Sequence, residues 1–512
     1  MNTDCDVIII GSGIGGATLA AALAPSGASI LILERGAYLP DSPEARDDVA
    51  IFERGHYRSS EEWLGADGKS FLPGNYYYVG GNSKFFGAVM YRYRAEDFLP
   101  RQHLRGSSPG WDLTYAEMEP WYARAEALFR VRGTASEDPT EPPRSGPYPF
   151  PPVPDEPALR QVRDRLRKAG VHPSSLPLAI DIEAWLQRGQ TGWDGFPNTG
   201  TGKIDAEVGP LAEALTYPNV RLMTGAQVIR LETDPEGQRV SAAIIRQNGR
   251  ETRLSARHFA VAAGAVQSAA LLLRSANAAH PKGLANRSDQ LGRNFMNHNT
   301  SAMITINPLI RNDSTYQKTL CFNDFYNDDA TARAPLGNVQ LLGRITGNIL
   351  KAQVPALPRA LARVIANRAF GWFLTSEDLP NPDSRVLVRG DQIVVDWQRS
   401  NMDAHHALIA RTKQVMRRAG FPLVLVRTFG NKTTSHQCGT ARLGASSKHS
   451  VVTPDCRSHD LPNLWITDAS VLPTSAAVNP ALTIAALALK AGKALSEELQ
   501  RMPGQAAAES GA

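Results

Sequence analysis

Asp6-Val-Ile-Ile-Ile10 runs directly into Gly11-Ser-Gly13-Ile-Gly-Gly16 near the start of the chain. Gly11 permits a tight turn out of a strand, Gly13 lets the backbone approach a pyrophosphate, and Gly16 lets the next helix pack closely on the sheet. That helix directs its unpaired N–H groups at the phosphates. A second apolar run, Ile30-Leu-Ile-Leu33, ends on Glu34, eighteen residues after Gly16. This spacing predicts a dinucleotide-binding β-α-β unit in which Glu34 accepts hydrogen bonds from ribose hydroxyls, and it fits NAD and FAD equally.

Length and charge limit the class of protein. At 512 residues the chain is long enough for two domains, because single hydrophobic cores stop growing beyond about 250 to 300 residues. Its 55 basic and 50 acidic residues are intermixed and give a formal charge of +5. The electrostatic field of such intermixed charges is too diffuse to indicate a nucleic-acid partner. We also expect no membrane span, because the apolar stretches fall short of the roughly 20 residues that one needs.

The cysteines occur singly, with no CxxC pair; they are Cys5, Cys321, Cys438 and Cys456. This usage predicts free buried thiols in a reducing compartment, and neither disulfides nor a metal site. The first apolar run begins within a few residues of Met1, which leaves no room for a secretory signal. We therefore expect a cytoplasmic location.

The middle of the chain mixes helical and strand patterns. Apolar residues at helical spacing predict a helix over residues 114–131, and the proline-rich residues 139–157 predict an extended surface segment. The last of the four strand-like runs that follow looks like a buried central strand, and it leads into a helix over residues 266–275. The four runs together resemble a β-meander that returns to the sheet. These runs cover residues 220–223, 227–231, 240–245 and 258–264.

The residues from 301 to 397 change character and predict a second domain inserted between parts of the first. Its strand-like runs indicate mostly antiparallel strands, at residues 301–306, 338–342, 370–374, 385–388 and 392–396. Arg389-Gly-Asp391 is a hairpin-type connection between the last two. The chain then returns to a buried strand, Leu464-Trp-Ile-Thr467, and to a long helix from about Pro480.

The far end carries three further segments: His436-Gln-Cys-Gly-Thr440, Thr467-Asp468-Ala-Ser470 and Asn479-Pro-Ala-Leu-Thr483. Together with the N-terminal glycines they resemble the glucose-methanol-choline (GMC) oxidoreductases over nearly the whole chain. Residues 79–87 look like the family's first signature, residues 264–275 like a degenerate second signature, and residues 292–298 like its GxNLxDH segment. The interval of 43 residues from His436 to Asn479 fits the family's catalytic pair. The amino-acid sequence of residues 85–94 and of residues 377–385 is most similar to that of the bacterial choline-dehydrogenase-like branch.

The resemblance implies an α/β fold, in which a Rossmann-like FAD-binding domain carries an inserted α+β substrate domain on a mostly antiparallel sheet. The expected FAD-binding domain comprises residues 1–100, 200–298 and 440–500, and the expected substrate-binding or cap domain comprises residues 101–199 and 299–439. Residues 501–512 are expected to form a disordered tail.

The resemblance also implies an FAD enzyme that oxidises an alcohol, and the residues fit that chemistry. We expect His436 to take the hydroxyl proton as general base while hydride passes to flavin N5. We expect Asn479 to donate a hydrogen bond to the developing alkoxide. The helix that begins at Pro480 directs its positive end at the flavin, where reduction deposits negative charge.

The remaining predicted site residues follow the family pattern. Val228 matches the position that holds the adenine, Asp468 matches an acid beside the ribityl chain, and His298 is expected to be structural, as is the inert thiol of Cys438. Phe85 and Phe86 stand where some relatives carry a flavin-linked histidine and its neighbour, so we expect non-covalent FAD. The predicted cofactor contacts are Gly11, Gly13, Ile14, Gly15, Gly16, Glu34, Arg35, Gly80, Gly81, Asn82, Ser83, Val228, Asp468, Ala469, Asn479, Pro480 and Thr483.

Two other functions stay open from sequence. An FAD-containing lyase of the hydroxynitrile-lyase type would share the fold, and an NAD-dependent dehydrogenase would account for the N-terminal glycines alone. On the main hypothesis the substrate is a sugar, an aminosugar, a polyol or a choline-like alcohol. Oxygen or another electron acceptor would then be the second partner.

Overall fold

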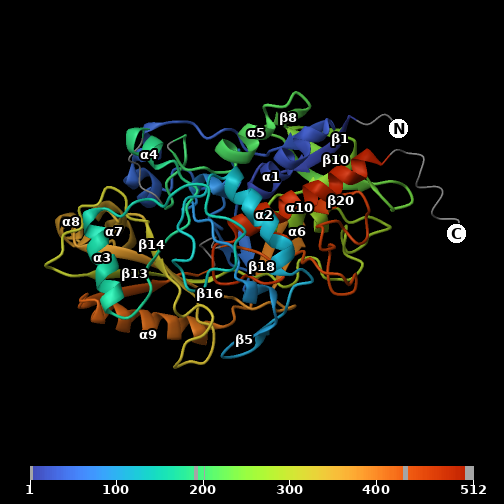
Figure 1. The fold of residues 1–512 in the computed structure, drawn as a ribbon. Helices are drawn as coiled ribbons and strands as arrows, with labels where there is room; N and C mark the ends of the chain where they lie inside the picture. Colours follow the sequence, from blue (N-terminus) through green and yellow to red (C-terminus); the bar gives the residue numbers. More distant parts are fainter. Residues whose placement is uncertain (1–3, 189–193, 201, 431–435, 502–512) are drawn as a thin grey trace.

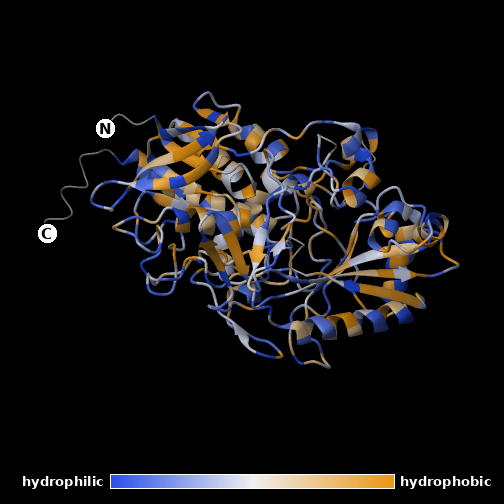
Figure 2. Cartoon of the chain, turned by 180° about the vertical axis from the view of Figure 1, so that it is seen from behind, coloured by the Kyte–Doolittle hydropathy of each residue, from blue (hydrophilic) through white to orange (hydrophobic). Residues whose placement is uncertain are grey.

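The computed structural model describes residues 4–188, 194–200, 202–430 and 436–501. Figure 1 shows two halves side by side, one around β1 and α10 and the other around β13 and α9. In Figure 2 the strands at the centre of each half are mostly apolar. The expected tail at residues 501–512 falls, apart from Arg501, outside the described residues.

A five-stranded parallel sheet forms the core of the first half. Its order is β20-β12-β1-β2-β8, with β20 at Leu464–Ile466, β12 at Ala256–Val261, β1 at Cys5–Ile10, β2 at Ile30–Leu33 and β8 at Val220–Met223. Every pairing in it is parallel. Strands β1, β2 and β20 are apolar along nearly their whole length, as expected of a sheet covered on both faces. Helix α1 (Ile14–Leu23) packs against α10 (Ala481–Gln500), which also contacts α2 (Tyr115–Leu128).

The meander predicted between residues 220 and 264 is only partly correct. The antiparallel sheet consists of β9 (Gln227–Thr233), β10 (Val240–Gln247) and β11 (Arg250–Leu254), whereas β8 belongs to the parallel sheet. Strand β12 lies inside the parallel sheet, as predicted for the run at residues 258–264. Strand β11 was not predicted, because its sequence is Arg-Glu-Thr-Arg-Leu and four of its five residues are exposed. A strand without an apolar face lacks the alternation of apolar and polar residues from which strands are predicted.

A six-stranded antiparallel sheet forms the second half, and three of its strands, β13, β15 and β16, fall on predicted runs. Its order is β19-β13-β16-β15-β14-β7, with β19 at Leu423–Thr428, β13 at Asn299–Ile306, β16 at Ala369–Ser376, β15 at Asn338–Leu341, β14 at Leu320–Phe322 and β7 at Ser174–Ser175. Helices α3 (Pro157–Lys168) and α9 (Met402–Arg418) share one apolar cluster with Trp372 of β16. The α/β class with a mostly antiparallel second sheet is therefore confirmed.

The predicted hairpin forms a separate small sheet. Strands β17 (Arg385–Arg389) and β18 (Gln392–Asp396) pair antiparallel, and β18 pairs in parallel with β3 (Trp63–Gly65), which pairs with β4 (Ser70–Phe71). The sequence pattern places this hairpin in the second domain, but β17 packs on α6 (Ala265–Arg274), so the hairpin lies against the first half.

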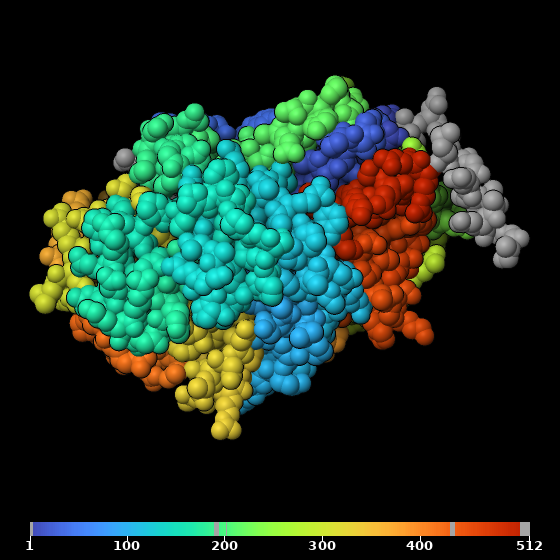
Figure 3. All heavy atoms as spheres, viewed as in Figure 1, coloured from blue at the N-terminus to red at the C-terminus, as the bar shows by residue number. Residues whose placement is uncertain are grey.

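The proline-rich segment is extended and held in place, as predicted. No helix or strand forms within it until α3 begins at Pro157. The Arg144 guanidinium lies 3.8 Å from the centre of the Tyr148 ring, and Val153 is buried. Figure 3 shows that the surrounding stretch, from about residue 110 to 180, covers much of one face of the molecule.

Short elements complete the fold. They are the helices α4 (Ile182–Arg188), α5 (Ala212–Ala214), α7 (Gly347–Gln353) and α8 (Arg359–Ala366), the strand pair β5 (Arg101–Gln102) and β6 (Ser107–Ser108), and the single turns η1 (Ala24–Ser26), η2 (Pro43–Arg46), η3 (Val49–Glu53), η4 (Gly81–Phe85), η5 (Ala95–Phe98), η6 (Glu207–Leu211) and η7 (Ala469–Val471). Among the helices in the described ranges, none has the length and apolar character to cross a bilayer.

Gly15 gives a test of how tightly α1 packs on the sheet. A Cβ atom there would lie 1.7 Å from the carbonyl oxygen of Thr467, which is backbone and cannot move aside cheaply. We expect Gly15→Ala to lower the free energy of unfolding by at least about 1–3 kcal/mol, the usual range for overpacking. Gly146→Ala, where a Cβ meets no described atom within 4 Å, is the control in urea titrations. Equal stability of the two variants would contradict this packing.

Candidate active site

A cavity of about 540 Å³ lies at the carboxyl edge of the parallel sheet and extends to the second half. The turns after β1, β2, β12 and β20 supply one wall, and residues next to β14, β15 and β16 supply the other. This edge is where open parallel sheets bind ligands. The cavity brings together most predicted site residues: Gly11, Gly13, Ile14, Gly15, Glu34, Arg35, Gly81, Asn82, Ser83, Val228, His436, Asp468, Ala469, Asn479 and Pro480.

Three predicted residues lie outside this lining. Gly16 packs α1 on the sheet, since a Cβ there would lie 2.0 Å from the Gly11 carbonyl oxygen. Gly80 adopts a left-handed conformation with φ of 91° at the start of η4. Thr483 is fully buried in α10, with its hydroxyl 2.9 Å from that of Tyr122. These three residues shape the walls and do not line the cavity.

The glycine turn after β1 has the shape that a pyrophosphate requires. Gly11 has a φ of 103° that L side chains rarely adopt. A Cβ on Gly13 would meet no described atom within 4 Å, although Gly13 lines the cavity. The open space beside Gly13 lies at the N-terminus of α1, where backbone N–H groups attract anions. A dinucleotide phosphate therefore fits here.

Glu34 is buried at the end of β2, and its carboxylate is held by the protein. One oxygen accepts hydrogen bonds from the Ser12 hydroxyl at 2.6 Å and the Ser12 backbone N–H at 3.1 Å. The other accepts from the Gly36 N–H at 2.8 Å. A carboxylate has about four lone-pair sites, so capacity is left for a ligand hydroxyl. The adjacent Arg35 lies over the Tyr77 ring, 3.8 Å from its centre.

The first signature loop lines the middle of the cavity. Ser83 donates to the Gly80 carbonyl at 2.6 Å, and the Asn82 side chain accepts from the Tyr76 N–H at 2.9 Å. Phe85 stacks on Tyr76 with ring centres 3.7 Å apart. Asn82, Ser83, Phe85 and Phe86 all line the cavity.

Asp468 both lines the cavity and braces it. One of its oxygens accepts from the Ser470 N–H at 2.8 Å, as a cap of η7. The other accepts from the Gly264 N–H at 2.9 Å and the Ser268 hydroxyl at 2.5 Å. Pro480, predicted as the first residue of the last helix, stands one residue before α10 and acts as its N-cap.

His436 and Asn479 meet in the cavity, 43 residues apart in sequence. The Asn479 Nδ2 lies 3.2 Å from His436 Nε2. His436 Nδ1 lies 2.8 Å from Nδ1 of His298, whose Nε2 lies 2.8 Å from the Ser475 carbonyl oxygen. The His436 backbone has a φ of 67°, the left-handed region, and strain of this kind concentrates at functional sites.

These contacts fix which nitrogen of each ring carries its proton. The Ser475 carbonyl can only accept, so His298 Nε2 bears the hydrogen and Nδ1 of a neutral His298 is a bare acceptor. His436 must then donate from Nδ1, which leaves its Nε2 lone pair free to accept from Asn479. A bare Nε2 is the form that a general base requires.

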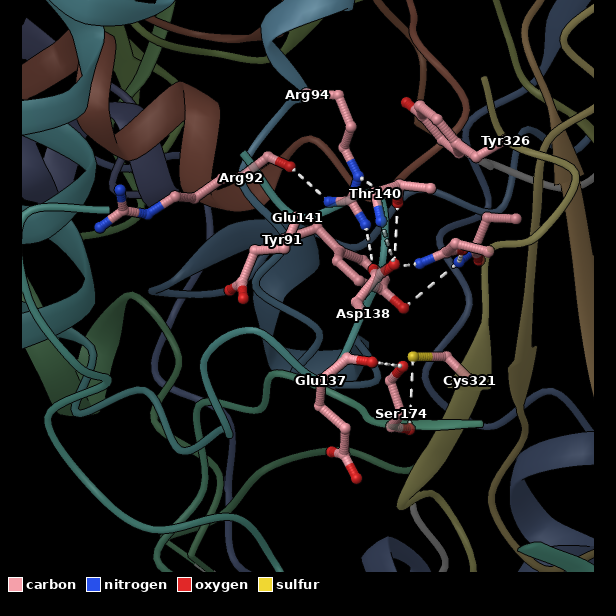
Figure 4. Close-up of polar contacts among 12 residues, drawn as sticks. Tyr91, Arg92, Arg94, Glu137, Asp138, Thr140, Glu141, Ser174, Cys321 and Tyr326 are labelled. Atoms are coloured by element: carbon pink, nitrogen blue, oxygen red, sulfur yellow. Dashed lines mark hydrogen bonds and ion pairs between the residues drawn. The ribbon is translucent and has the colours of Figure 1, made fainter. Parts of the chain in front are cut away.

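A chain of side-chain amides independently fixes the orientation of Asn479 toward His436. The Asp138 carboxylate accepts from Asn323, which accepts from Asn338, which accepts from Gln340. Gln340 also donates to Asn479 Oδ1 at 2.9 Å, so the Asn479 amide must turn its NH₂ group to His436. Arg94 and Thr140 hold the Asp138 end, as Figure 4 shows.

The electrostatics keep both imidazoles neutral. Burial lowers the pKa of His298 to about 4. Burial, His298 and the Lys318 ammonium together hold the pKa of His436 well below its usual value. Burial also raises the pKa of the Cys438 thiol far above its normal range, so it stays protonated. All four cysteines, which lie in the described part of the chain, are buried as predicted.

Sequence reasoning missed the second role of His298 and the residues of the far wall. His298 was assigned as structural, whereas the structure places its ring against His436. Its position at the end of the GxNLxDH-like segment was the available signal. Gln340, Lys318 and Asp194 also line the cavity, and nothing in their local sequence marks them.

Comparisons with known proteins agree on one family. Models described as GMC oxidoreductase match residues 175–300 and 380–488, and one described as NAD(P)-binding Rossmann-like domain matches residues 9–56. The chain is 28% identical to 6'''-hydroxyparomomycin C oxidase of Streptomyces lividus and 29% identical to paromamine 6'-oxidase of Streptomyces fradiae, covering 96% of this chain and 92% of each relative. It is 27% identical to 2-methyl-1,2-propanediol dehydrogenase of Mycolicibacterium austroafricanum, covering 96% of this chain and 95% of that one.

Solved structures show the same fold at lower identity. Pyridoxine 4-oxidase from Mesorbium loti superposes with a TM-score of 0.68 at 18% identity, covering 96% of this chain and 99% of that one.

The neutral His298 predicts a pH dependence of stability. Its pKa is about 4 in the folded protein and about 6.5 in an unfolded chain. The unfolded state therefore binds more protons between these values, and the free energy of unfolding falls as the pH falls from about 6.5 to 4, by about 1.4 kcal/mol per pH unit from this group. His298→Gln, which can still donate to Ser475 and accept from His436, should flatten that slope.

Urea titrations across this range measure the effect. His449→Gln, a change at an exposed histidine, is the control and should keep the slope of the unmodified protein. His258 and His405, whose pKa values burial lowers to about 4 and about 3, continue to contribute in every variant. An unchanged slope in His298→Gln would show that His298 is not held neutral.

Proposed function

The chain belongs to the GMC oxidoreductase family, an enzyme family that oxidises alcohols to carbonyls, and on that premise we propose how it acts. His436 is the general base for the alcohol, and Asn479 is the hydrogen-bond donor to its oxygen. The observation that carries this proposal is the bare Nε2 of His436, fixed from one side by His298 and Ser475 and from the other by the amide chain.

FAD is the cofactor that the family implies, and the cavity fits it. When bound, it supplies the acceptor for the hydride that leaves the carbinol carbon. Gly11, Gly13 and the N-terminus of α1 would hold its pyrophosphate, and Glu34 its adenosine ribose. Val228, Asp468 and the loop around Gly81 would line the rest of it. Non-covalent attachment is part of the proposal, since Phe85 and Phe86 offer no group that could form a bond.

His436 takes the hydroxyl proton on Nε2. Hydride loss becomes easier as that proton leaves, and a positioned base typically contributes about 10²–10⁴-fold. The positive charge that arises on the ring is shared with His298, because His436 Nδ1–H donates to its bare Nδ1. Asn479 Nδ2, which lies 3.2 Å from His436 Nε2, can turn its N–H to the developing alkoxide.

The substrate is proposed to be a hydroxyl-rich alcohol. The three relatives are named for a hydroxyparomomycin, for paromamine and for 2-methyl-1,2-propanediol. These names support the sugar, aminosugar and polyol alternatives over a choline-like alcohol. The choline-dehydrogenase-like branch, the cytoplasmic location and the electron acceptor stay predictions. So does the division into an FAD-binding domain and a cap, which the two large sheets support.

The alternatives are separable by one observation. A yellow protein that alcohols bleach under anaerobic conditions supports the proposal. A yellow protein that no alcohol reduces would favour the lyase, and a colourless protein that binds only NAD would favour the NAD-dependent dehydrogenase.

His436→Ala tests the base directly. We expect the variant to keep its yellow colour, because His436 is not among the residues that would hold the pyrophosphate or the ribose, and to lose flavin reduction rate by about 10²–10⁴-fold. Anaerobic stopped-flow absorbance with a saturating alcohol measures it. His406→Ala, at an exposed position of α9, is the control. Reduction at nearly the normal rate in His436→Ala would remove this residue from the role.

Gly13→Ala tests the pyrophosphate position. A Cβ there meets no described atom within 4 Å, so the fold should tolerate it, but it would occupy the space next to α1. We expect normal stability of the apoprotein and loss of co-purified FAD, measured by flavin absorbance against protein. Full flavin content in Gly13→Ala would place the pyrophosphate elsewhere.

A further inference from the structure

An ion pair between a buried lysine and a half-buried aspartate forms part of the cavity wall. The Lys318 Nζ lies 2.8 and 3.0 Å from the two carboxylate oxygens of Asp194. The side chain of Lys318 is 3% exposed and that of Asp194 is 28% exposed. The backbone N–H of Gly343 donates to Asp194 at 2.6 Å and fixes the carboxylate. Both charged side chains line the same cavity as His436 and Asn479.

Burial of such a pair needs a reason. Removing two charges from water costs several kcal/mol per ion, so a buried ion pair is weak evidence for stability. Gly87 of the first signature loop makes room for it, because a Cβ there would lie 2.2 Å from Asp194 Oδ1 and 3.0 Å from Lys318 Nζ. The pair therefore stands against the loop that lines the middle of the cavity.

The pair lines the same cavity as the reacting groups, and Gly343, which donates to Asp194, is three residues from Gln340, which donates to Asn479. Lys318 is among the groups that lower the pKa of His436. Gln340, which orients Asn479, lines the same wall, and its Oε1 has no hydrogen-bond partner among the described residues. A buried acceptor without a donor costs about 1–3 kcal/mol, so a ligand hydroxyl that donates to it would be favoured.

The charge of this wall selects among alcohols. Among the described lining residues, the three carboxylates of Asp194, Glu34 and Asp468 are matched in number by three cationic side chains, those of Lys318, Arg35 and Arg274. The wall therefore offers no excess negative charge to a quaternary ammonium. A hydroxyl both donates and accepts, and an ammonium next to a carboxylate offers it the two matching partners.

We propose that Lys318 and Asp194 form a subsite that binds a second hydroxyl of the substrate, next to the carbinol at His436. The hydroxyl oxygen accepts from the Lys318 ammonium, and its hydrogen is donated to Asp194. The substrate class that fits is a neutral vicinal diol or polyol. This inference rests on the proposed function and adds the residues that select the substrate.

The test compares a matched pair of alcohols, 1,2-propanediol and 1-propanol. The wild-type enzyme should reduce its flavin with kcat/KM about 10- to 100-fold higher for the diol, the usual contribution of a hydrogen bond to a charged group. Lys318→Met and Asp194→Asn should each bring that ratio close to one by lowering the value for the diol. Lys69→Met is the control, because its ion pair with Asp67 is on the surface and Lys69 is 85% exposed.

A binding measurement makes the result independent of turnover. Calorimetric titration of His436→Ala should show the same preference for the diol, and the double variants with Lys318→Met or Asp194→Asn should lose it. Two substitutions with opposite charge changes guard against a folding defect in one of them.

Failure of the subsite and failure of the proposed function give different results. Alcohols that bleach the wild-type flavin without preference for the diol, or a preference that persists in both variants, would overturn the subsite and leave the proposed function in place. A wild-type flavin that neither these two nor any alcohol of a broad panel can reduce would overturn the proposed function, and with it the subsite.

Discussion

The parallel orientation of β20, β12, β1, β2 and β8 is the constraint on which the site depends. Parallel strands end at the same edge, so the turns that follow four of them meet there although they are as far apart in sequence as Gly11 and Asp468. The cavity follows from this topology together with close packing. Gly15 and Gly16 let α1 approach the backbone of Thr467 and of Gly11, which sets its N-terminus at the edge. A larger residue at either position would move the helix that is to meet the phosphates.

The protonation state of His436 is set by groups outside the cavity. A lone imidazole in water can carry its proton on either nitrogen. Here the Ser475 carbonyl at one end and the Asp138 carboxylate at the other can only accept, and the hydrogen bonds between them leave one consistent arrangement. Burial and the Lys318 ammonium also lower the pKa of His436, which favours the neutral ring. The second half of the molecule thus contributes to the protonation state of His436 as well as to one wall of the cavity, because Asn323, Asn338 and Gln340 lie on or beside its sheet.

Much of the fold was predictable because its apolar strands and its glycine turn are local patterns. The runs at residues 5–10, 30–33 and 464–466 are apolar on both faces and lie in the central sheet, as expected. Strand β11 was not predictable, since its charged residues face solvent and form ion pairs at the surface of the sheet. The neighbouring runs at residues 220–223 and 227–231 look alike in sequence, and only their pairing places the first in the parallel sheet and the second in the antiparallel one.

The sequence by itself determined the dinucleotide turn, the α/β class, the family and the pairing of His436 with Asn479. Particular residue types at fixed intervals indicate each of these features, because backbone geometry relates an interval in sequence to a position in space. The tertiary structure decided the role of His298, the amide chain to Asp138 and the Lys318–Asp194 pair. Each of these needs at least one contact between residues more than 100 positions apart. A hydrogen bond or an ion pair forms only where folding brings donor and acceptor within about 3 Å.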